Sequence, residues 1–426
     1  MMRSLYAAVS GLKGNQTYMD VIGNNIANVN TTGYKASNVT FQDMLSQTLQ
    51  GASSASGTKG GTNPMQVGLG VGVGSISTNF TDGSTQSTGI STNLAISGDG
   101  FFVVGTPTNQ MYTRSGDFTT DEQGNFVNSA GYSVLGWPAD ASGVVDTTQP
   151  ISALQIPVGS TMAAKVSTTI TFSGNLNASA TAGADSAQPV SYDLYDTQGN
   201  KYTLTGSIVK TADNTWTFTP TSPIVGGTDG KTTVATVTGG TATIVFNADG
   251  TLNDTSTVFN ALTINPAGGP YAGAGTFTVQ PSSSTTTPMT QNGSDSTAKI
   301  SNTDGYAAGT LNGKTISTTG EIIGSFTNGK TQAIGQVALA VFNNPDGLLS
   351  AGGNLYTKTT NSGEAQIGSA GTGGRGSFTP GSLEMSNVDL AQQFTNMIVA
   401  QRAFQANSKI ITTDDNMLEE LVNLKR

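Results

Sequence analysis

The sequence predicts an α+β fold that is mostly β. Long N- and C-terminal α-helices pair as a coiled-coil-like stalk, and two β-rich domains are nested between them. Glycine accounts for 55 of the 426 residues, yet 382–426 contains neither glycine nor proline. Apolar residues recur at steps of three and four at both ends, as on one face of a helix. Between the ends, β-branched and aromatic runs alternate with turn residues, which is typical of strands and hairpins.

The C-terminal segment predicts a long helix. Ser386 and Asp389 have the spacing of a capping box, with Ser386 as the N-cap. A continuous helix over 386–426 would be roughly 60 Å long, so it needs a partner. Its predicted apolar seam is Leu390, Phe394, Met397, Phe404, Ile411 and Leu418, with polar residues between them.

The N-terminal segment supplies a partner helix that ends within 28–33. Gly11, Gly14 and Gly23 weaken this helix by about 1 kcal/mol each relative to alanine, so it needs packing to form. Two interpretations stay open: a two-helix stalk within one chain, or an assembly interface between subunits. The predicted interface residues on this helix are Leu5, Val9, Leu12, Met19 and Ile26.

The middle of the chain predicts strands and turns. Segment 51–61 (GASSASGTKGG) is expected to be a flexible loop. Residues 67–73 are expected to form a strand with a bare glycine face; the spacing does not fit a phosphate-binding loop. Hairpins are expected over 111–135 and 190–208, with Asp/Asn/Gly turns that lack the ligand pattern of a calcium loop.

Composition excludes several kinds of chemistry. The chain has no cysteine, no histidine and a formal net charge of −9. Disulfides, thiolate or imidazole metal ligands and Ser-His-Asp triads are therefore ruled out, and a basic footprint for nucleic acid is missing. We predict no catalytic residue, no cofactor and no metal. No stretch approaches the roughly 20 apolar residues of a membrane span, and no segment has the pattern of a secretory signal.

Both ends of the chain resemble known sequences. Segments 4–35 and 386–424 resemble the opening and closing signatures of bacterial flagellar rod and hook proteins, and 93–104 (NLAISGDGFFVV) and 112–138 agree as well. The central block resembles the outer domain of hook proteins in position, whereas 50–64 resembles a segment of distal rod proteins. The signature residues are Asn24, Asn25, Asn28, Gly33, Asn387, Val388, Asp389, Gln401 and Arg402.

The resemblance implies a domain arrangement. Residues 1–30 and 385–426 would form a helical inner-tube domain, and 31–90 with 365–384 an extended, β-containing connecting segment. Residues 91–148 and 298–364 would form an inner β-domain, and 149–297 an inserted outer β-domain.

The resemblance also implies a function without catalysis. The chain would be the subunit of the flagellar hook, a helical homopolymer that transmits torque and surrounds the export channel. Implied partners are further copies of the chain, the distal rod protein, the hook cap, the hook–filament junction protein and the export apparatus. The implied location is outside the cell, reached without a cleaved secretory signal.

Two other functions stay open from the residues alone. A distal rod protein with an unusual insertion would belong to the same structural class. A secreted β-rich adhesin or carbohydrate-binding protein would explain the Thr- and Gly-rich centre but not the paired helical ends. An enzyme is disfavoured because the carboxylates lie at turns, although a glycosidase-type pair stays open.

Overall fold

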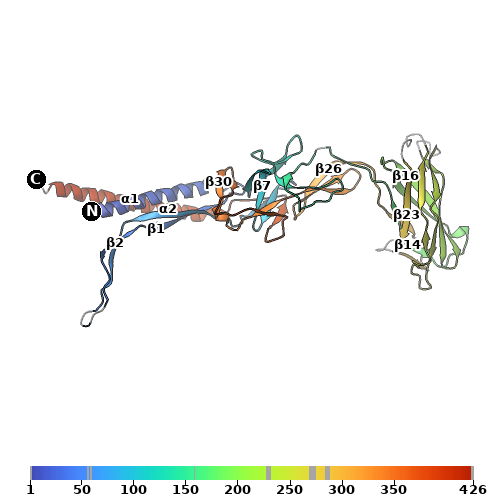
Figure 1. The fold of residues 1–426 in the computed structure, drawn as a ribbon, viewed down its shortest axis with the longest axis horizontal. Coiled ribbons are helices and arrows are strands. Elements are labelled where there is room, and N and C mark those ends of the chain that lie inside the picture. Colours follow the sequence, from blue (N-terminus) through green and yellow to red (C-terminus); the bar gives the residue numbers. More distant parts are fainter. Residues whose placement is uncertain are drawn as a thin grey trace. The chain divides into compact units, whose positions relative to one another are not determined.

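The computed structural model describes residues 2–54, 57, 60–157, 159–226, 232–267, 275–283 and 288–423. The predicted fold class is confirmed, because the chain is mostly β and carries one long helix at each end (Figure 1). The chain divides into two compact units. The first comprises Met1–Val158, Lys314–Gly324 and Gln332–Arg426, and the second comprises Gly159–Gly313 and Ser325–Thr331.

The two helices of the first unit pack side by side in opposite directions (Figure 1). Helix α1 spans Met2–Ala27 and helix α2 spans Leu390–Asn423. The start of α1 lies beside the end of α2, where Ser4 Oγ donates to Asp414 Oδ2 at 2.7 Å. The predicted pairing of the chain ends is therefore confirmed.

The predicted N-cap of α2 was wrong. Asp389 caps the helix, since its Oδ1 accepts from the backbone N–H groups of Ala391 (2.9 Å) and Gln392 (3.1 Å). Ser386 instead accepts a bond from Val388 N–H at 3.3 Å, outside the helix. Residues 386–388 are not helical because Asn387 is held by backbone groups elsewhere in the fold, as described below.

An antiparallel ribbon follows α1. Strand β1 (Ser37–Asp43) pairs with β4 (Val71–Thr78), and β2 (Ser46–Gln50) pairs with β3 (Met65–Gly68). The loop expected over 51–61 contains one bridge just at its border, Ser53 with Thr62, and residues 55, 56, 58 and 59 lie outside the described residues.

The strand predicted over 67–73 is in fact divided at Gly70, which has a φ of +123°. A Cβ on Gly70 would lie 2.2 Å from Ser10 Oγ of α1, so only glycine allows this close approach. Ser10 Oγ also accepts from Val71 N–H at 3.2 Å. The glycine therefore lets the ribbon turn against α1.

The β-region of the first unit contains one six-stranded sheet and several short pairs. The order of the six-stranded sheet is β30 (Leu349–Gly352), β31 (Leu355–Thr357), β8 (Asn109–Thr113), β7 (Phe101–Thr106), β29 (Leu339–Val341) and β32 (Gln366–Gly368). The short pairs are β5 (Thr85–Ser87) with β34 (Ser382–Glu384), β6 (Leu94–Ser97) with β33 (Ser377–Pro380), and β9 (Phe118–Thr120) with β10 (Phe126–Asn128).

A second sheet of this region joins segments that are far apart in sequence. The order of its six strands is β12 (Ser152–Ala153), β11 (Leu135–Pro138), β28 (Thr331–Val337), β27 (Glu321–Phe326), β26 (Gly309–Ile316) and β13 (Thr161–Met162). The hairpin predicted over 111–135 is shorter than expected, because only β9 and β10 pair across its turn. The chain is mostly buried over 337–342, where it passes at Ala338 from β28 of this sheet to β29 of the other.

The second unit has two sheets that share one apolar core. The first sheet has the order β18 (Ile224–Gly226), β19 (Thr232–Gly239), β22 (Leu262–Pro266), β23 (Phe277–Ser283), β14 (Thr169–Asn177) and β24 (Met289–Asn292), with β25 (Lys299–Thr303) also paired to β14. The other has the order β15 (Gln188–Tyr195), β16 (Lys201–Ala212), β17 (Thr215–Pro220), β20 (Ala242–Val245) and β21 (Val258–Phe259). Strand β13 (Thr161–Met162) pairs with β26 (Gly309–Ile316).

The β15–β16 hairpin confirms the prediction for 190–208. Both strands alternate buried and exposed residues, and the turn between them is closed by Asp196. Its Oδ1 accepts from the N–H groups of Gln198 (2.8 Å) and Asn200 (2.9 Å). Within the described residues no helix is long and apolar enough to span a membrane.

Four exposed aspartates close turns in the same way as Asp196. Asp121, Asp140, Asp146 and Asp249 accept hydrogen bonds from side chains within their own turns, and these bonds hold the pKa of each carboxyl below its usual value. Backbone N–H donors of the same turns act in the same direction. The ionised form of each aspartate therefore favours the folded turn.

These turns predict a pH dependence of stability. Their carboxyls have lower pKa values folded than unfolded, so their stabilisation is complete above the unfolded pKa of about 4 and is lost as the pH falls through the folded values. We expect the thermal midpoint to be level from pH 7 to about 5 and to fall below pH 4. In Asp140→Asn, which keeps the turn acceptor, the fall should be smaller. An identical fall in the variant and the parent would contradict this account.

Candidate functional site at the paired chain ends

The two chain ends meet at a cluster of four charged side chains. This junction cluster consists of Lys35, which follows α1, Glu384 at the end of β34, Arg114 after β8, and Asp82 between β4 and β5. Lys35 Nζ donates to Glu384 Oε1 at 2.5 Å. Arg114 Nη1 lies 3.1 Å from Asp82 Oδ1 and 3.4 Å from Glu384 Oε2. Lys35 and Glu384 have fully buried side chains, so this contact is an ion pair inside the protein.

Further bonds compensate the burial of these charges. Lys35 Nζ also donates to the carbonyl of Thr81 at 2.7 Å, and the N–H of Gly83 donates to Glu384 Oε1 at 2.9 Å. The Arg114 guanidinium lies 5.3 Å from the ring centroid of Phe101. Burial lowers the pKa of Lys35, and the Glu384 carboxylate acts in the opposite direction. A buried charge is tolerated only when it is paired and hydrogen-bonded in this way.

Two asparagines tie the helices to the strands. The side-chain amide of Asn25 binds both backbone groups of Ser37: it accepts from the N–H at 3.0 Å and donates to the carbonyl at 2.9 Å. The same amide also donates to the side-chain oxygen of Gln393 in α2 at 3.3 Å. Asn387 accepts from Ala36 N–H at 2.8 Å and donates to the carbonyl of Asn79 at 2.9 Å. Asn25 therefore links α1 to β1 and α2, and Asn387 links the segment before α2 to the end of the β1–β4 pair.

Gly33 is required where the chain turns between Asn28 and Lys35. Its φ is +68°, and a Cβ there would lie 2.5 Å from the backbone nitrogen of Ser115. Its N–H donates to the carbonyl of Glu384 at 2.8 Å. Any side chain would disturb the approach of the N-terminal segment to the junction cluster.

The seam between α1 and α2 mixes polar and apolar residues. The buried residues of α2 are Gln393, Ala400 and Asp414, which lie on a heptad repeat. Asn407 continues this repeat, and its side-chain nitrogen would lie 2.8 Å from a Cβ on Gly11 of α1. Polar side chains thus share one of the two heptad positions of the seam with Ala400, and the half-buried Met397, Phe404 and Ile411 hold the other.

The structure places the predicted interface residues in two groups. The half-buried group consists of Leu5, Val9, Leu12, Met19, Ile26, Met397, Phe404 and Ile411. Leu390, Phe394 and Leu418 are exposed, by 39%, 51% and 39%. On α2, the half-buried Met397, Phe404 and Ile411 therefore alternate with the buried heptad positions along the seam, whereas Leu390, Phe394 and Leu418 lie outside it.

The other signature residues support the helix ends or lie on the surface. Asn24 Oδ1 accepts from Asn28 Nδ2 at 2.7 Å after the last turn of α1. Val388 and Asp389 lead into α2. Gln401 and Arg402 are exposed on α2, and Arg402 Nη1 donates to Gln405 at 3.3 Å.

Sequence reasoning missed all four residues of the junction cluster, as well as the buried Ile22 of α1. One signal was available. Only 11% of the residues are charged, so a lysine and a glutamate within the two end segments were candidates for a pair. No spacing rule indicates which charges meet, because Lys35 and Glu384 lie 349 positions apart. In the described part of the chain, no group of three or more acidic side chains could hold a metal ion.

Four family models match successive parts of the chain. "Flagella basal body rod protein" matches residues 5–35, and "Flagellar hook protein FlgE/F/G D1 domain" matches 95–178. "Flagellar basal body protein FlaE D2 domain" matches 169–306, and "Flagellar basal body rod FlgEFG protein C-terminal" matches 379–424. The fold with joined chain ends is therefore that of a flagellar axial protein, the class that includes rod and hook proteins.

Full-length relatives identify the family within this class. The flagellar hook protein FlgE of Borreliella burgdorferi is 41% identical, with 100% of each chain covered. That of Escherichia coli (strain K12) is 39% identical, with 98% of this chain and 99% of the relative covered. The rod protein FlgG of Bacillus subtilis is 33% identical, with 100% of each covered. The chain belongs to the flagellar hook protein FlgE family.

A solved structure has a similar fold. The hook protein FlgE2 of Helicobacter pylori superposes with a TM-score of 0.54 at 16% identity, covering 70% of this chain and 100% of the other.

The junction cluster predicts unequal effects of two lysine substitutions. Lys35→Met leaves the buried Glu384 carboxylate without its nearest cation, and we expect a loss of roughly 3–5 kcal/mol of stability in the first unit. Lys358→Met removes an exposed ion pair with Glu364 (2.7 Å) in the same unit and should cost under about 1 kcal/mol. Denaturant titration followed by hydrogen exchange would measure both.

Restoring charge balance distinguishes the ion pair from simple packing. The double variant Lys35→Met with Glu384→Gln should recover a large part of the loss, because no unpaired charge then remains inside. Equal losses for Lys35→Met and Lys358→Met would refute a special role for the buried pair.

Proposed function

We propose that this chain is the structural subunit of the flagellar hook. Copies of it would assemble into a curved helical tube that acts as a universal joint, transmits torque from rod to filament and surrounds the export channel. The observation that carries the proposal is a chain whose joined ends leave apolar helix surface uncovered, in a member of the hook protein family.

The uncovered surface lies along α2. Its exposed large apolar residues occupy the positions away from the seam and extend over most of the helix. Exposed apolar patches of this kind mark protein–protein contacts. They are Leu390, Phe394, Ile398, Val399, Ile410, Met417, Leu418, Leu421 and Val422.

Assembly would complete the folding of the chain ends. The seam places polar side chains among its apolar ones, and glycines weaken α1, so the two helices alone are marginal. Neighbouring copies would bury the outer face of α2 at about 25 cal/mol per Å² of apolar surface. The predicted interface residues, from Leu5 to Leu418, would divide between contacts within and between subunits.

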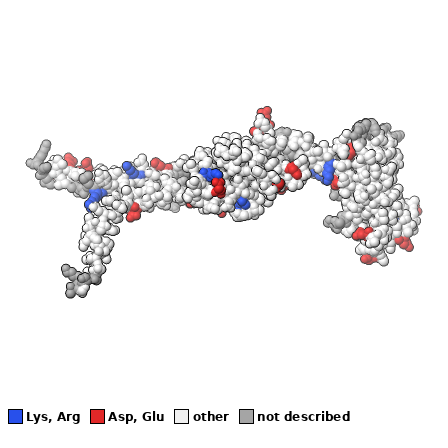
Figure 2. Space-filling model, in the orientation of Figure 1, with Lys and Arg blue, Asp and Glu red and all other residues white. Residues whose placement is uncertain are grey.

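The remaining surface suits interfaces that slide. Figure 2 shows few charged side chains scattered over a largely uncharged surface. Hydroxyl and amide groups form weak contacts that exchange partners at small cost, whereas ion pairs or large apolar anchors would fix one register. A hook that bends while it rotates requires such exchange between its outer domains.

The proposed partners are further copies of the chain, the distal rod protein, the hook cap, the hook–filament junction protein and the export apparatus. The proposed location is the external flagellum, reached by flagellar type III export. The distal rod protein is the alternative within the same class, and location of the protein by immunogold labelling separates the two. A β-rich adhesin is not favoured, since it would have no need of the joined helical ends.

Substitution on the outer face of α2 tests the assembly. Phe394→Asp places a charge on the exposed apolar face, and we expect it to prevent polymerisation while the β-regions stay folded. Sedimentation and electron microscopy would measure polymer formation, and hydrogen exchange would follow α1 and α2. In the parent protein we expect fast exchange in the monomer and slow exchange in the polymer.

The matched control is Gln405→Asp, an exposed polar residue of the same helix. It should still polymerise if the apolar face is what matters. Polymers of Phe394→Asp with parental yield, or protected helices in a verified monomer, would argue against this role.

Segment 51–61 gives a test of mechanical function. Its extension of the β2–β3 ribbon would add contacts between subunits, so we expect its deletion to change hook curvature or bending stiffness. The measurement is the curvature of isolated hooks and their bending under load. Hooks that assemble and bend like the parent would remove this segment from the mechanism.

A further inference from the structure

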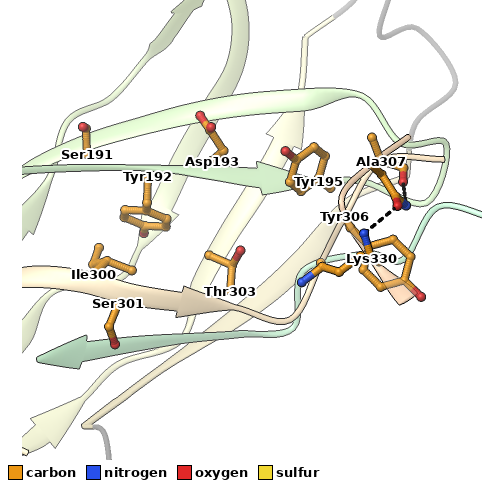
Figure 3. Close-up of a pocket in the computed structure, with 12 residues that line it drawn as sticks. Ser191, Tyr192, Asp193, Tyr195, Ile300, Ser301, Thr303, Tyr306, Ala307 and Lys330 are labelled. Carbon is orange, nitrogen blue, oxygen red and sulfur yellow. Dashed lines mark hydrogen bonds between the residues drawn. The ribbon is translucent and has the colours of Figure 1, made fainter. Parts of the chain in front are cut away.

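The second unit has a hollow of about 510 Å³ between strands β15 and β25. Figure 3 shows the residues around it, which come from these strands and from the segments that contain Tyr306 and Lys330. The volume is in the range of small-molecule sites. None of the roles proposed above uses this hollow.

The hollow does not fit an added strand. At one end of the outer edge of β15, the backbone of Tyr195 is already bonded to Ser167. The Tyr195 N–H donates to Ser167 Oγ at 3.0 Å, and the Tyr195 carbonyl accepts from the Ser167 N–H at 2.9 Å. With a period of two, Asp193, Ser191 and Pro189 face the same edge, and Pro189 has no N–H to donate. Strand β25 is irregular where it pairs with β14. The part of the β15 edge that stays free, between Pro189 and Tyr195, is too short for the backbone hydrogen bonds of a stably added strand.

The lining carries little net charge. Asp193 is already engaged by Lys201 Nζ at 2.8 Å and by Thr203 Oγ1 at 2.8 Å. Lys330 Nζ lies 5.8 Å from the ring centroid of Tyr306. One acid and one base line the hollow, which favours an uncharged ligand over an anion or a cation.

The lining combines aromatic rings with hydroxyl groups. Tyrosine presents an apolar ring face and a polar tip, so one side chain can contact both C–H and O–H groups of a ligand. The rings are Tyr192, Tyr195 and Tyr306, and the hydroxyl residues are Ser191, Ser301 and Thr303.

Tyr192 provides the most specific observation. The residue is 8% exposed, and its hydroxyl is buried without a hydrogen-bond partner among the described residues. Its ring extends from β15 toward Ile300 of β25 (Figure 3). Burial raises the pKa of Tyr192, so the hydroxyl stays protonated and can donate. An unsatisfied buried hydroxyl is unfavourable and marks a place where a partner is missing.

We propose that this hollow binds a neutral saccharide. Sugars have apolar C–H faces that stack on aromatic rings and many hydroxyl groups that exchange hydrogen bonds with Ser, Thr and Tyr. A ligand hydroxyl would satisfy Tyr192 directly or through one water molecule. The site would let the second unit contact glycans, either free or attached to protein, independently of hook assembly.

Saturation-transfer NMR on the full chain tests the proposal. The probes are maltotriose and chitotriose as free saccharides and N-acetylgalactosamine linked to threonine as a protein-borne glycan. A decapeptide of Ser and Thr is the probe for strand binding. We expect transfer to at least one saccharide probe and none to the peptide. Transfer to the peptide alone, or to no probe, would overturn the proposal.

Three variants locate the binding. Tyr306→Ala should abolish transfer by removing a ring, and Tyr192→Phe should weaken binding about tenfold by removing one hydrogen bond. Because the Tyr192 hydroxyl has no hydrogen-bond partner in the described part of the chain, Tyr192→Phe should leave the thermal midpoint unchanged or raise it. Tyr132→Ala, an exposed tyrosine of the first unit, is the matched control and should bind like the parent. Equal binding by all three variants would show that the hollow is not the site.

Discussion

The fold of this chain depends on the contact between Lys35 and Glu384, because it joins segments 349 positions apart and brings α1 beside α2. Closing so long a loop is entropically unfavourable, and the cost grows with the logarithm of its length. A β-region that folds between the two segments shortens the loop that must be closed. The joining of the chain ends therefore depends on the folded β-regions, and the pairing of the helices depends on the junction cluster.

The helix pair places polar residues on its inner seam and leaves several large apolar residues outside it. Gln393 and Asp414 lie on the inner seam, while Phe394 and Leu418 are exposed. In an ordinary stalk the apolar residues would satisfy each other within the chain and leave a polar exterior. Here hydrogen bonds from Ser4 to Asp414 and from Asn25 to Gln393 fix two points of the intramolecular contact. In the proposed polymer the exposed apolar residues of α2 would be covered by neighbouring subunits, and the pair would be weak alone and strong when assembled.

The sequence predicted the local features and failed on the non-local ones. The helical period, the long C-terminal helix and the hairpin closed by Asp196 follow from residues close together, and the structure confirms them. The cap at Ser386 failed because Asn387 binds Ala36, a partner 351 positions away. The strand over 67–73 failed because Gly70 meets Ser10 of α1. The buried ion pair was missed for the same reason: propensity and spacing do not indicate which distant segments meet.

The scarcity of charge connects these observations. Burying Lys35, Arg114 and Glu384 is costly, so their contacts hold only in a narrow geometry, and this geometry fixes how the helices join the β-region of the first unit. Elsewhere the surface offers mainly hydroxyl and amide groups, whose hydrogen bonds exchange with water and with each other at small cost. In the proposed role, a subunit built in this way would be stiff at the junction of its ends and compliant over the rest of its surface. A tube of such subunits could keep its inner wall closed while its outer contacts shift, which a chain with charge spread evenly over its surface would not allow.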